Sequence, residues 1–381
     1  MAKRQILNSK NKTLLVTHLP EEPDWSDLPP ELISLISRKL IDIFDFVRLR
    51  AVCKTWRSAV RTSDLAPQLP WIMDNSDQSF KKGYLRFYSL LTGKTHNFNV
   101  PRSIQKFITG SAYNYLFSYD MQTCDCSLIN PLTKDEISLP PSPVGIWYPT
   151  CVPADPSSRY AVISIHPTLK TTDLLFCQLG DLDWTLMKEE SFPYYRIHGM
   201  GIKCLLEGFV FHDGLCYATD RDTGSTVVIN LAMQTVICVA PQPESELRKE
   251  FAYLIVSAGE ILRVCQYNKR CQQETSYFDI YRLHLGNRDG NVINPCWIKI
   301  DNINHQFLFL HGKHGCSFRA DDFSGFIGNN IYFLTKRNIK ETNILSRYNL
   351  KDGKIETLQV PEELGCSWFV PSLCKKSSNY R

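Results

Sequence analysis

Four residues in the last quarter of the chain have side chains that commonly bind zinc: His305, His311, His314 and Cys316. Imidazole and thiolate suit this ion, and His311 and His314 are close enough in sequence to converge on it. The neighbouring glycines also allow a long loop that exposes the histidines. Such a loop on a rigid scaffold would serve binding instead of metal chemistry. We predict no metal site here and treat the segment as a candidate binding surface.

Two cysteine pairs are spaced closely enough to interact, among 14 cysteines in the chain. Cys124 and Cys126 alternate as on one face of a strand and could bind metal or form a redox pair. No second cysteine or histidine pair lies nearby at zinc-site spacing. Cys265 and Cys271 flank a polar tip, where a labile disulfide is conceivable. Because no secretory signal or tight cysteine framework is visible, reduced thiols, mostly buried, are the favoured interpretation.

The sequence contains no motif that predicts catalysis. The run Asp322–Phe326 has a serine before glycine but lacks the second glycine that a nucleophile elbow requires. No glycine-rich phosphate loop and no paired-carboxylate motif is present. Asp120, Asp213 and Asp352 occupy turn-like contexts, where a carboxylate ordinarily caps its own backbone. We therefore predict no catalytic residues, no cofactor and a non-enzymatic protein.

Composition excludes several functional classes. The 381 residues are 43% hydrophobic and 22% charged, as in ordinary globular proteins, and the formal net charge is only +4. This small charge gives no case for nucleic acid or membrane surfaces as partners. The longest apolar runs are too short to span a bilayer. The expected location is the cytoplasm, the nucleus or both.

One stretch, residues 25–61, has helical periodicity. Two prolines, Pro29 and Pro30, suit the first turn of a helix. An apolar stripe then recurs at three- and four-residue spacing, formed by Leu32, Leu35, Ile36 and Leu40. After a short break a second apolar face follows, formed by Phe46, Leu49, Val52, Cys53, Trp56 and Val60. Helices this short cannot bury so much apolar surface among themselves, so they must pack on the rest of the chain or on another protein.

Residue identities favour the second possibility. The segments LPPEL (28–32) and LRAVCKTWR (49–57) resemble an F-box, the helical module that docks substrate adaptors on the Skp-type subunit of SCF ubiquitin ligases. The resemblance implies eight residues that face the Skp-type partner or hold the module together: Leu28, Pro29, Leu32, Leu40, Leu49, Val52, Cys53 and Trp56. Trp56 is expected to be buried and to cost about 3–5 kcal/mol on truncation to alanine. On pattern alone, the helices could equally be a structural cap.

The remainder of the chain shows a loose repeat of strand, polar turn and strand. Six such pairs have their turns near residues 93, 133, 181, 232, 288 and 352. A second type of hairpin precedes several of them, in the segments 211–219, 256–265 and 326–335. Two hairpins in a unit of about 40 to 50 residues give the four strands of a β-propeller blade. We predict six blades, or seven if residues 71–88 and 367–373 complete a further one; a β-sandwich pair is the alternative architecture.

The order of these segments after an F-box is similar to plant F-box proteins that carry a C-terminal KIB-type β-propeller. The resemblance implies an α+β multidomain chain: a flexible leader (1–23), the F-box (24–62), a linker (63–70), an all-β propeller (71–373) and a tail (374–381). It implies a substrate-recognition subunit that joins a Skp-type adaptor, and through it a cullin, to an unknown target protein for ubiquitination. The alternative functions are a propeller enzyme or a small-ligand sensor with a helical cap, and a Skp-binding scaffold without a cullin.

Overall fold

The computed structural model describes residues 25–74, 84–99, 106–112, 115–120, 122–141, 151–153, 160–165, 173–187, 206–243, 251–268, 276–286, 294–312, 314–336, 343–361 and 367–373. The chain divides into two compact units, one ending at Ala66 and the other beginning at Pro67. No helix among the described residues is long and apolar enough to cross a membrane.

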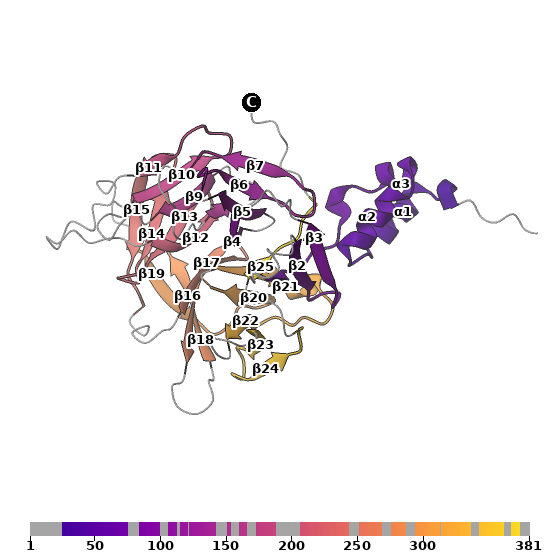
Figure 1. Cartoon of the computed structure of the whole chain (residues 1–381). Helices are drawn as coiled ribbons and strands as arrows, with labels where there is room; N and C mark the ends of the chain where they lie inside the picture. The colour runs from indigo at the N-terminus through magenta and orange to yellow at the C-terminus, as the bar shows by residue number, and fades with distance from the viewer. Residues whose placement is uncertain are drawn as a thin grey trace, which may run out of the picture. The chain divides into compact units, whose positions relative to one another are not determined.

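The first unit consists of short helices with defined ends. They are η1 (Trp25–Asp27), α1 (Pro30–Ser37), α2 (Ile43–Ala51), α3 (Lys54–Ala59) and η2 (Thr62–Asp64) (Figure 1). Helix α1 starts as predicted, with proline at its first position. The Asp42 carboxylate caps α2 by accepting from the Phe44 amide at 2.8 Å. The Cys53 sulfur caps α3 in the same way, from the Trp56 amide at 3.4 Å.

The core of the helical unit differs from the predicted apolar faces. Four apolar side chains are almost fully buried, Ile33, Ile43, Phe46 and Val60. The predicted stripe of α1 lies outside instead, because Ile33 and Ser37, one helical turn apart, form its buried side. The second predicted apolar face does not lie on one helix, because α2 ends at Ala51 and α3 begins at Lys54. Phe46 and Val60 therefore point into the core while Val52 is exposed.

The second unit contains six sheets among the described residues, five of four strands and one of five. Sheet A comprises β25 (Ser367–Phe369), β1 (Trp71–Asp74), β2 (Tyr84–Ser89) and β3 (Thr95–Asn99). Sheet B comprises β4 (Lys106–Ala112), β5 (Tyr115–Asp120), β6 (Cys126–Ile129) and β7 (Glu136–Leu139). Sheet C comprises β8 (Cys151–Pro153), β9 (Tyr160–Ile165), β10 (Asp173–Gln178) and β11 (Thr185–Met187). Sheet D comprises β12 (Leu206–His212), β13 (Leu215–Asp220), β14 (Thr226–Asn230) and β15 (Thr235–Ala240). Sheet E comprises β16 (Phe251–Ser257), β17 (Glu260–Asn268), β18 (Ser276–His284) and β19 (Cys296–Ile300). Sheet F comprises β21 (His314–Arg319), β20 (Gln306–His311), β22 (Asn330–Lys336), β23 (Asn343–Asn349) and β24 (Ile355–Leu358), and is followed along the ring by sheet A.

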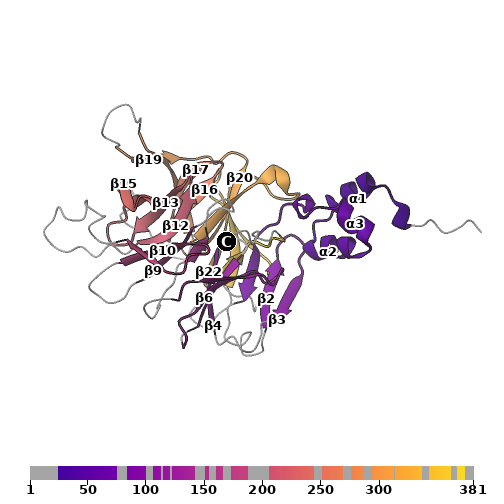
Figure 2. The ribbon, with the colours of Figure 1, turned by 90° about the horizontal axis from the view of Figure 1, so that it is seen from above.

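The sheets follow one another around a ring, so the predicted β-propeller is confirmed and the sandwich is excluded (Figures 1 and 2). Inner strands of neighbouring sheets contact each other, as in β4 with β8 and β12 with β16. Apolar clusters fill the spaces between sheets; one joins sheets C and D through Phe176, Phe209 and Val227. Each sheet thus buries both faces against its neighbours, which explains the continuous apolar runs in strands such as β5 and β16.

The first and last described strands of the second unit close the ring. Strand β25 pairs antiparallel with β1, with Trp71 opposite Phe369. The two segments considered for a seventh blade, 71–88 and 367–373, therefore do not form one of their own. They join the hairpin β2–β3 in sheet A.

The predicted outer hairpins are confirmed at all six positions, since each pairs the strands on either side of its turn. Two of the three predicted inner hairpins are also present, β12–β13 and β16–β17. Their two-residue turns place Asp213–Gly214 and Ala258–Gly259 at positive φ, which matches the twist of antiparallel strands. These turns need only local chemistry, so the sequence was sufficient to locate them.

The third predicted inner hairpin, at 326–335, is wrong. Residues Phe326–Asn329 instead form the approach to β22, which runs parallel to β20 because β21 is inserted between them in the chain. A Cβ atom on Gly328 would lie 2.4 Å from the Asn304 carbonyl oxygen. The glycine is therefore needed for close approach of two backbone segments, and not for a tight turn.

One turn geometry recurs in sheets A, B, D and F. In the turn that starts at Asn130, the Lys134 amide donates to the Asn130 carbonyl and the Asn130 amide donates to the Asp135 carbonyl, both at 2.9 Å. Turns with the same two backbone bonds start at Ser89, Asp120, Asp220 and Asn349. In all five the first side chain accepts from an amide inside the turn, and the fifth residue has a positive φ. This geometry confirms the turn role expected for Asp120, which is the first residue of its turn. Asp352 also caps a turn, but as the fourth residue, by accepting from the Lys354 amide.

Replacing Lys134 by glycine is expected to stabilise the propeller by about 0.5–1 kcal/mol. Lys134 has a φ of 59°, a left-handed conformation that costs a side-chain-bearing residue energy and glycine nothing. The reverse change, Gly353→Ala, places a Cβ atom no closer than 3.7 Å to its neighbours, so it tests the backbone effect alone and should destabilise by about 1 kcal/mol. Urea unfolding measures both, and equal midpoints for all three proteins would contradict the argument.

Candidate binding surfaces

Seven large apolar side chains of the helical unit are exposed, and we refer to them together as the outer apolar face: Trp25, Leu32, Leu35, Ile36, Ile41, Val47 and Val52. Each of these residues is more than 40% exposed, and Trp25 and Val52 reach 66% and 61%. A unit of this size that leaves so many large apolar side chains in water gives up much of the burial that could stabilise it. Such a concentration of exposed apolar residues marks an interaction surface.

The eight residues predicted for this site fall into two groups. Leu32 and Val52 belong to the outer apolar face, and Pro29 is exposed at the start of α1. Leu28, Leu40, Leu49, Cys53 and Trp56 are half-buried. The prediction omitted several exposed members, namely Trp25, Leu35, Ile36, Ile41 and Val47. Leu35 and Ile36 were visible in the apolar stripe, but periodicity does not reveal which side of a helix faces outward.

Trp56 is not the fully buried anchor that we expected. Its side chain is half-buried, and its indole Nε1 donates to the Trp25 carbonyl at 3.2 Å. The guanidinium groups of Arg50 and Arg57 also tie α2 to the following chain, by donating to the Val60 and Arg50 carbonyls at 3.0 and 3.2 Å. A loss of about 3–5 kcal/mol in stability applies to a fully buried tryptophan, so truncation of the half-buried Trp56 to alanine should destabilise the helical unit by less than that.

The histidine and cysteine residues lie along one hairpin and the turn before it, and the side chain of His311 lies outside the described part of the structure. Strands β20 and β21 pair instead of forming a long loop, with His311 opposite His314 at the end of the ladder. His305 lies on the other end, where its Nδ1 is 3.4 Å from an Asp321 carboxylate oxygen. Burial raises the pKa of Cys316 to about 12, so its thiol is not readily ionised. Within the part of the chain that the structure describes, no three metal-binding side chains gather.

The structure describes three of the four paired cysteines. Cys126 is buried at the start of β6, while Cys124 lies in the preceding turn with a φ of 60° and not in the strand. Cys265 is buried in β17, and Cys271 lies outside the described residues. None of the nine cysteines whose side chains are described forms a disulfide. Burial raises the pKa of Cys177 to about 12 and that of Cys238 to about 11, which suits inert core thiols.

A groove opens between sheets A and F of the propeller, with a volume of about 220 Å³. Strand β2 and its turn contribute Tyr88 and Leu90, and the segment before β22 contributes Gly325 and Phe326. Sheet F supplies the remaining lining residues, Tyr332, Leu345, Arg347, Leu358, Gln359 and Val360. No sequence motif pointed to this groove, because its two walls are far apart in the chain.

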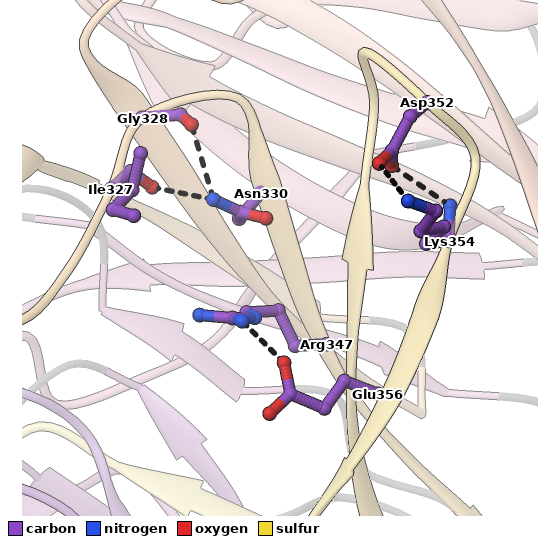
Figure 3. A network of polar contacts seen from close by, with 7 residues as sticks. All are labelled: Ile327, Gly328, Asn330, Arg347, Asp352, Lys354 and Glu356. Atoms are coloured by element: carbon purple, nitrogen blue, oxygen red, sulfur yellow. Dashed lines mark hydrogen bonds and ion pairs between the residues drawn. The ribbon is translucent and has the colours of Figure 1, made fainter.

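Arg347 is the charged group of this groove. Its side chain is 29% exposed and forms an ion pair with Glu356 on the neighbouring strand (Figure 3). Burial lowers the pKa of Arg347, but hydrogen bonds to Tyr332 and Glu356 outweigh that effect and leave the pKa raised. For Tyr332, burial has the opposite effect and raises the pKa, and the hydrogen bond with Arg347 offsets part of this rise. Both groups therefore keep their protons at neutral pH.

The loop beside the groove is held by its own polar contacts. The Asn330 side-chain amide donates to the carbonyls of Ile327 and Gly328 at 2.9 and 3.1 Å (Figure 3). Asn330 is buried, so these bonds compensate the loss of water around its amide nitrogen. At the same end of the neighbouring strand, Asp352 accepts from the Lys354 amide at 3.1 Å and closes the β23–β24 turn. These local bonds fix the strand ends two residues beyond the Tyr332–Arg347 pair.

Comparison with known proteins agrees with both units. The profile of the family described as KIB1-4 beta-propeller matches residues 87–364, and the profile described as F-box-like matches residues 25–66. An F-box/kelch-repeat protein of Arabidopsis thaliana is 24% identical over 87% of this chain and 90% of its own. The Arabidopsis F-box protein SKIP23 is 22% identical over 91% of this chain and 95% of its own. TolB from Acinetobacter baumannii, a solved structure, is 10% identical, with a TM-score of 0.45 over 80% of this chain and 66% of that one.

Proposed function

Because this chain belongs to the KIB1-4 β-propeller family and carries an F-box-like module, we propose that it is the substrate-recognition subunit of an SCF-type ubiquitin ligase. The observation that carries the proposal is the outer apolar face of the helical unit. A Skp-type adaptor would cover this face as a groove covers an apolar helix surface. The contact set combines the predicted residues Leu28, Pro29, Leu32, Leu40, Leu49, Val52, Cys53 and Trp56 with the exposed members that the prediction omitted.

In this proposal the two units have separate tasks. The F-box at 24–62 binds the adaptor and through it a cullin, residues 63–70 link the units, and the propeller at 71–373 binds the target protein. Support for this division comes from the separation into compact units at Ala66 and Pro67. The six sheets support six blades, with sheet A as the closing blade. The chain contributes no chemistry; it raises the concentration of the target near the conjugating enzyme, in the cytoplasm, the nucleus or both.

Co-purification with a Skp-type adaptor tests the proposal. The wild type is expected to bind, and Val52→Glu should reduce binding at least about tenfold, because it introduces a charge into an apolar contact. Leu182→Glu is the matched control, since Leu182 is 87% exposed on the propeller and should leave adaptor binding unchanged.

Circular dichroism and thermal unfolding of each variant establish that both units are folded. A folded wild-type chain that does not bind any Skp-type adaptor would overturn the ligase function. It would leave a helical cap on a propeller that binds or transforms a small ligand.

A further inference from the structure

The register of sheet F places two different rows of side chains beside the groove. Tyr332 lies opposite Arg347, and Arg347 lies opposite Glu356, which forms a polar row across three strands. Two residues along, Leu334, Leu345 and Leu358 form an apolar row in the same way. Side chains two residues apart share a face, so both rows lie on one side of the sheet. That side belongs to the cluster that includes Tyr88 and Leu90 of sheet A.

The size of the groove limits what can occupy it. Its volume of about 220 Å³ lies below the 300–1,000 Å³ of sites that enclose a drug-sized ligand. It suits one or two amino-acid side chains. The walls are apolar at Leu90, Phe326 and Val360. An apolar side chain is therefore the occupant that the larger part of the groove favours.

The charge of the groove is positive at one end. Among the described residues that line it, Arg347 alone is ionised. Its partner Glu356 lies at the solvent side, with 59% of its side chain exposed. Ion pairs of this exposure contribute little stability, so an incoming carboxylate can replace Glu356 at small cost. The hydrogen bond with Tyr332 holds the guanidinium in place for a bidentate contact.

We propose that this groove between sheets A and F binds a peptide segment of the target protein in which a bulky apolar side chain adjoins a carboxylate. The apolar side chain packs on the leucine row, and the carboxylate pairs with Arg347 in place of Glu356. The carboxylate comes either from a peptide C-terminus or from an acidic side chain. This inference rests on the proposed function, since it assigns the target-binding site of the propeller.

Ligand-observed NMR titration of the full chain tests the proposal with three probes. The first is the peptide Ser-Gly-Ser-Leu with a free C-terminal carboxylate, the second is the same peptide amidated, and the third is amidated Ser-Gly-Asp-Leu-Gly. The free acid or the aspartate peptide is expected to bind about tenfold tighter than the amidated Ser-Gly-Ser-Leu, which has no carboxylate. Whichever of the two binds more tightly identifies the source of the carboxylate.

Two variants should change the affinity in opposite directions. Arg347→Gln removes the cation and should abolish the preference for the carboxylate probes. Glu356→Gln removes the competing carboxylate and should tighten binding several-fold, a gain that misfolding cannot produce. Arg282→Gln is the matched control, because Arg282 pairs with Glu260 at 3.1 Å on sheet E, also at a half-exposed position.

Equal binding of all three probes, no binding of any, or weaker binding by Glu356→Gln would overturn the proposal. Adaptor binding by the helical unit is measured separately, so failure of the groove leaves the ligase function standing. Loss of adaptor binding with intact carboxylate recognition would overturn the ligase function and leave the groove as a peptide-binding site.

Discussion

Replacing Ile33 by alanine is expected to unfold the helical unit, whereas replacing Leu35 on the same helix should leave it folded. Ile33 is 0% exposed in the small core of this unit, and truncation of a fully buried isoleucine costs about 2–5 kcal/mol. Units of this size are stable by only a few kcal/mol, so one such cavity is sufficient to unfold them. Leu35 is 57% exposed, and its truncation should change stability by less than about 0.5 kcal/mol.

Hydrogen exchange of peptides from residues 30–60 measures this difference directly, because amides of an unfolded unit lose their protection. The propeller peptides of each variant serve as the internal control. Leu35→Ala should in addition weaken adaptor binding, since it removes part of the outer apolar face. A Leu35→Ala variant that unfolds while Ile33→Ala stays protected would show that the core has been assigned to the wrong side of α1.

Replacing Phe369 by alanine is expected to destabilise the whole propeller by about 3–5 kcal/mol. Phe369 is 0% exposed, and its ring centroid lies 5.1 Å from that of Phe87 and 6.3 Å from that of Trp71. It belongs to β25, the last described strand of the propeller, which pairs with β1. The Asn130 side chain strengthens this closure by donating to the Ser372 carbonyl at 3.0 Å. Loss of the Phe369 ring therefore weakens the contact that closes the ring of sheets.

Phe251→Ala is the matched control, because Phe251 is 43% exposed in β16 and does not close the ring. Its effect should remain below about 1 kcal/mol. Thermal or urea unfolding, followed by the circular dichroism of the β-structure, compares the two variants. Similar losses of stability in both would mean that closure by β25 contributes no more than an ordinary surface contact.

The sequence alone was sufficient for features that depend on neighbours in the chain. The Asp213–Gly214 turn and the Asn130–Asp135 turn encode their own backbone conformations, so the hairpins around them could be located. The proline at the start of α1 and the run that ends at Arg57 likewise identified the helical unit and its family. A repeat of two hairpins then predicted a propeller, because local pairs of this kind can bury their faces only against further copies.

Only the tertiary structure decided the features that depend on distant segments. Periodicity placed Leu32, Leu35 and Ile36 on one stripe, but packing of α1 against α3 determined that Ile33 faces the core and the stripe faces water. The insertion of β21 turned an expected hairpin at Gly328 into a parallel pairing. The groove at Arg347 joins residues more than 200 positions apart, and its position follows from the closure of sheet A beside sheet F. Such contacts arise from pairing between segments far apart in the chain, which local propensity does not specify.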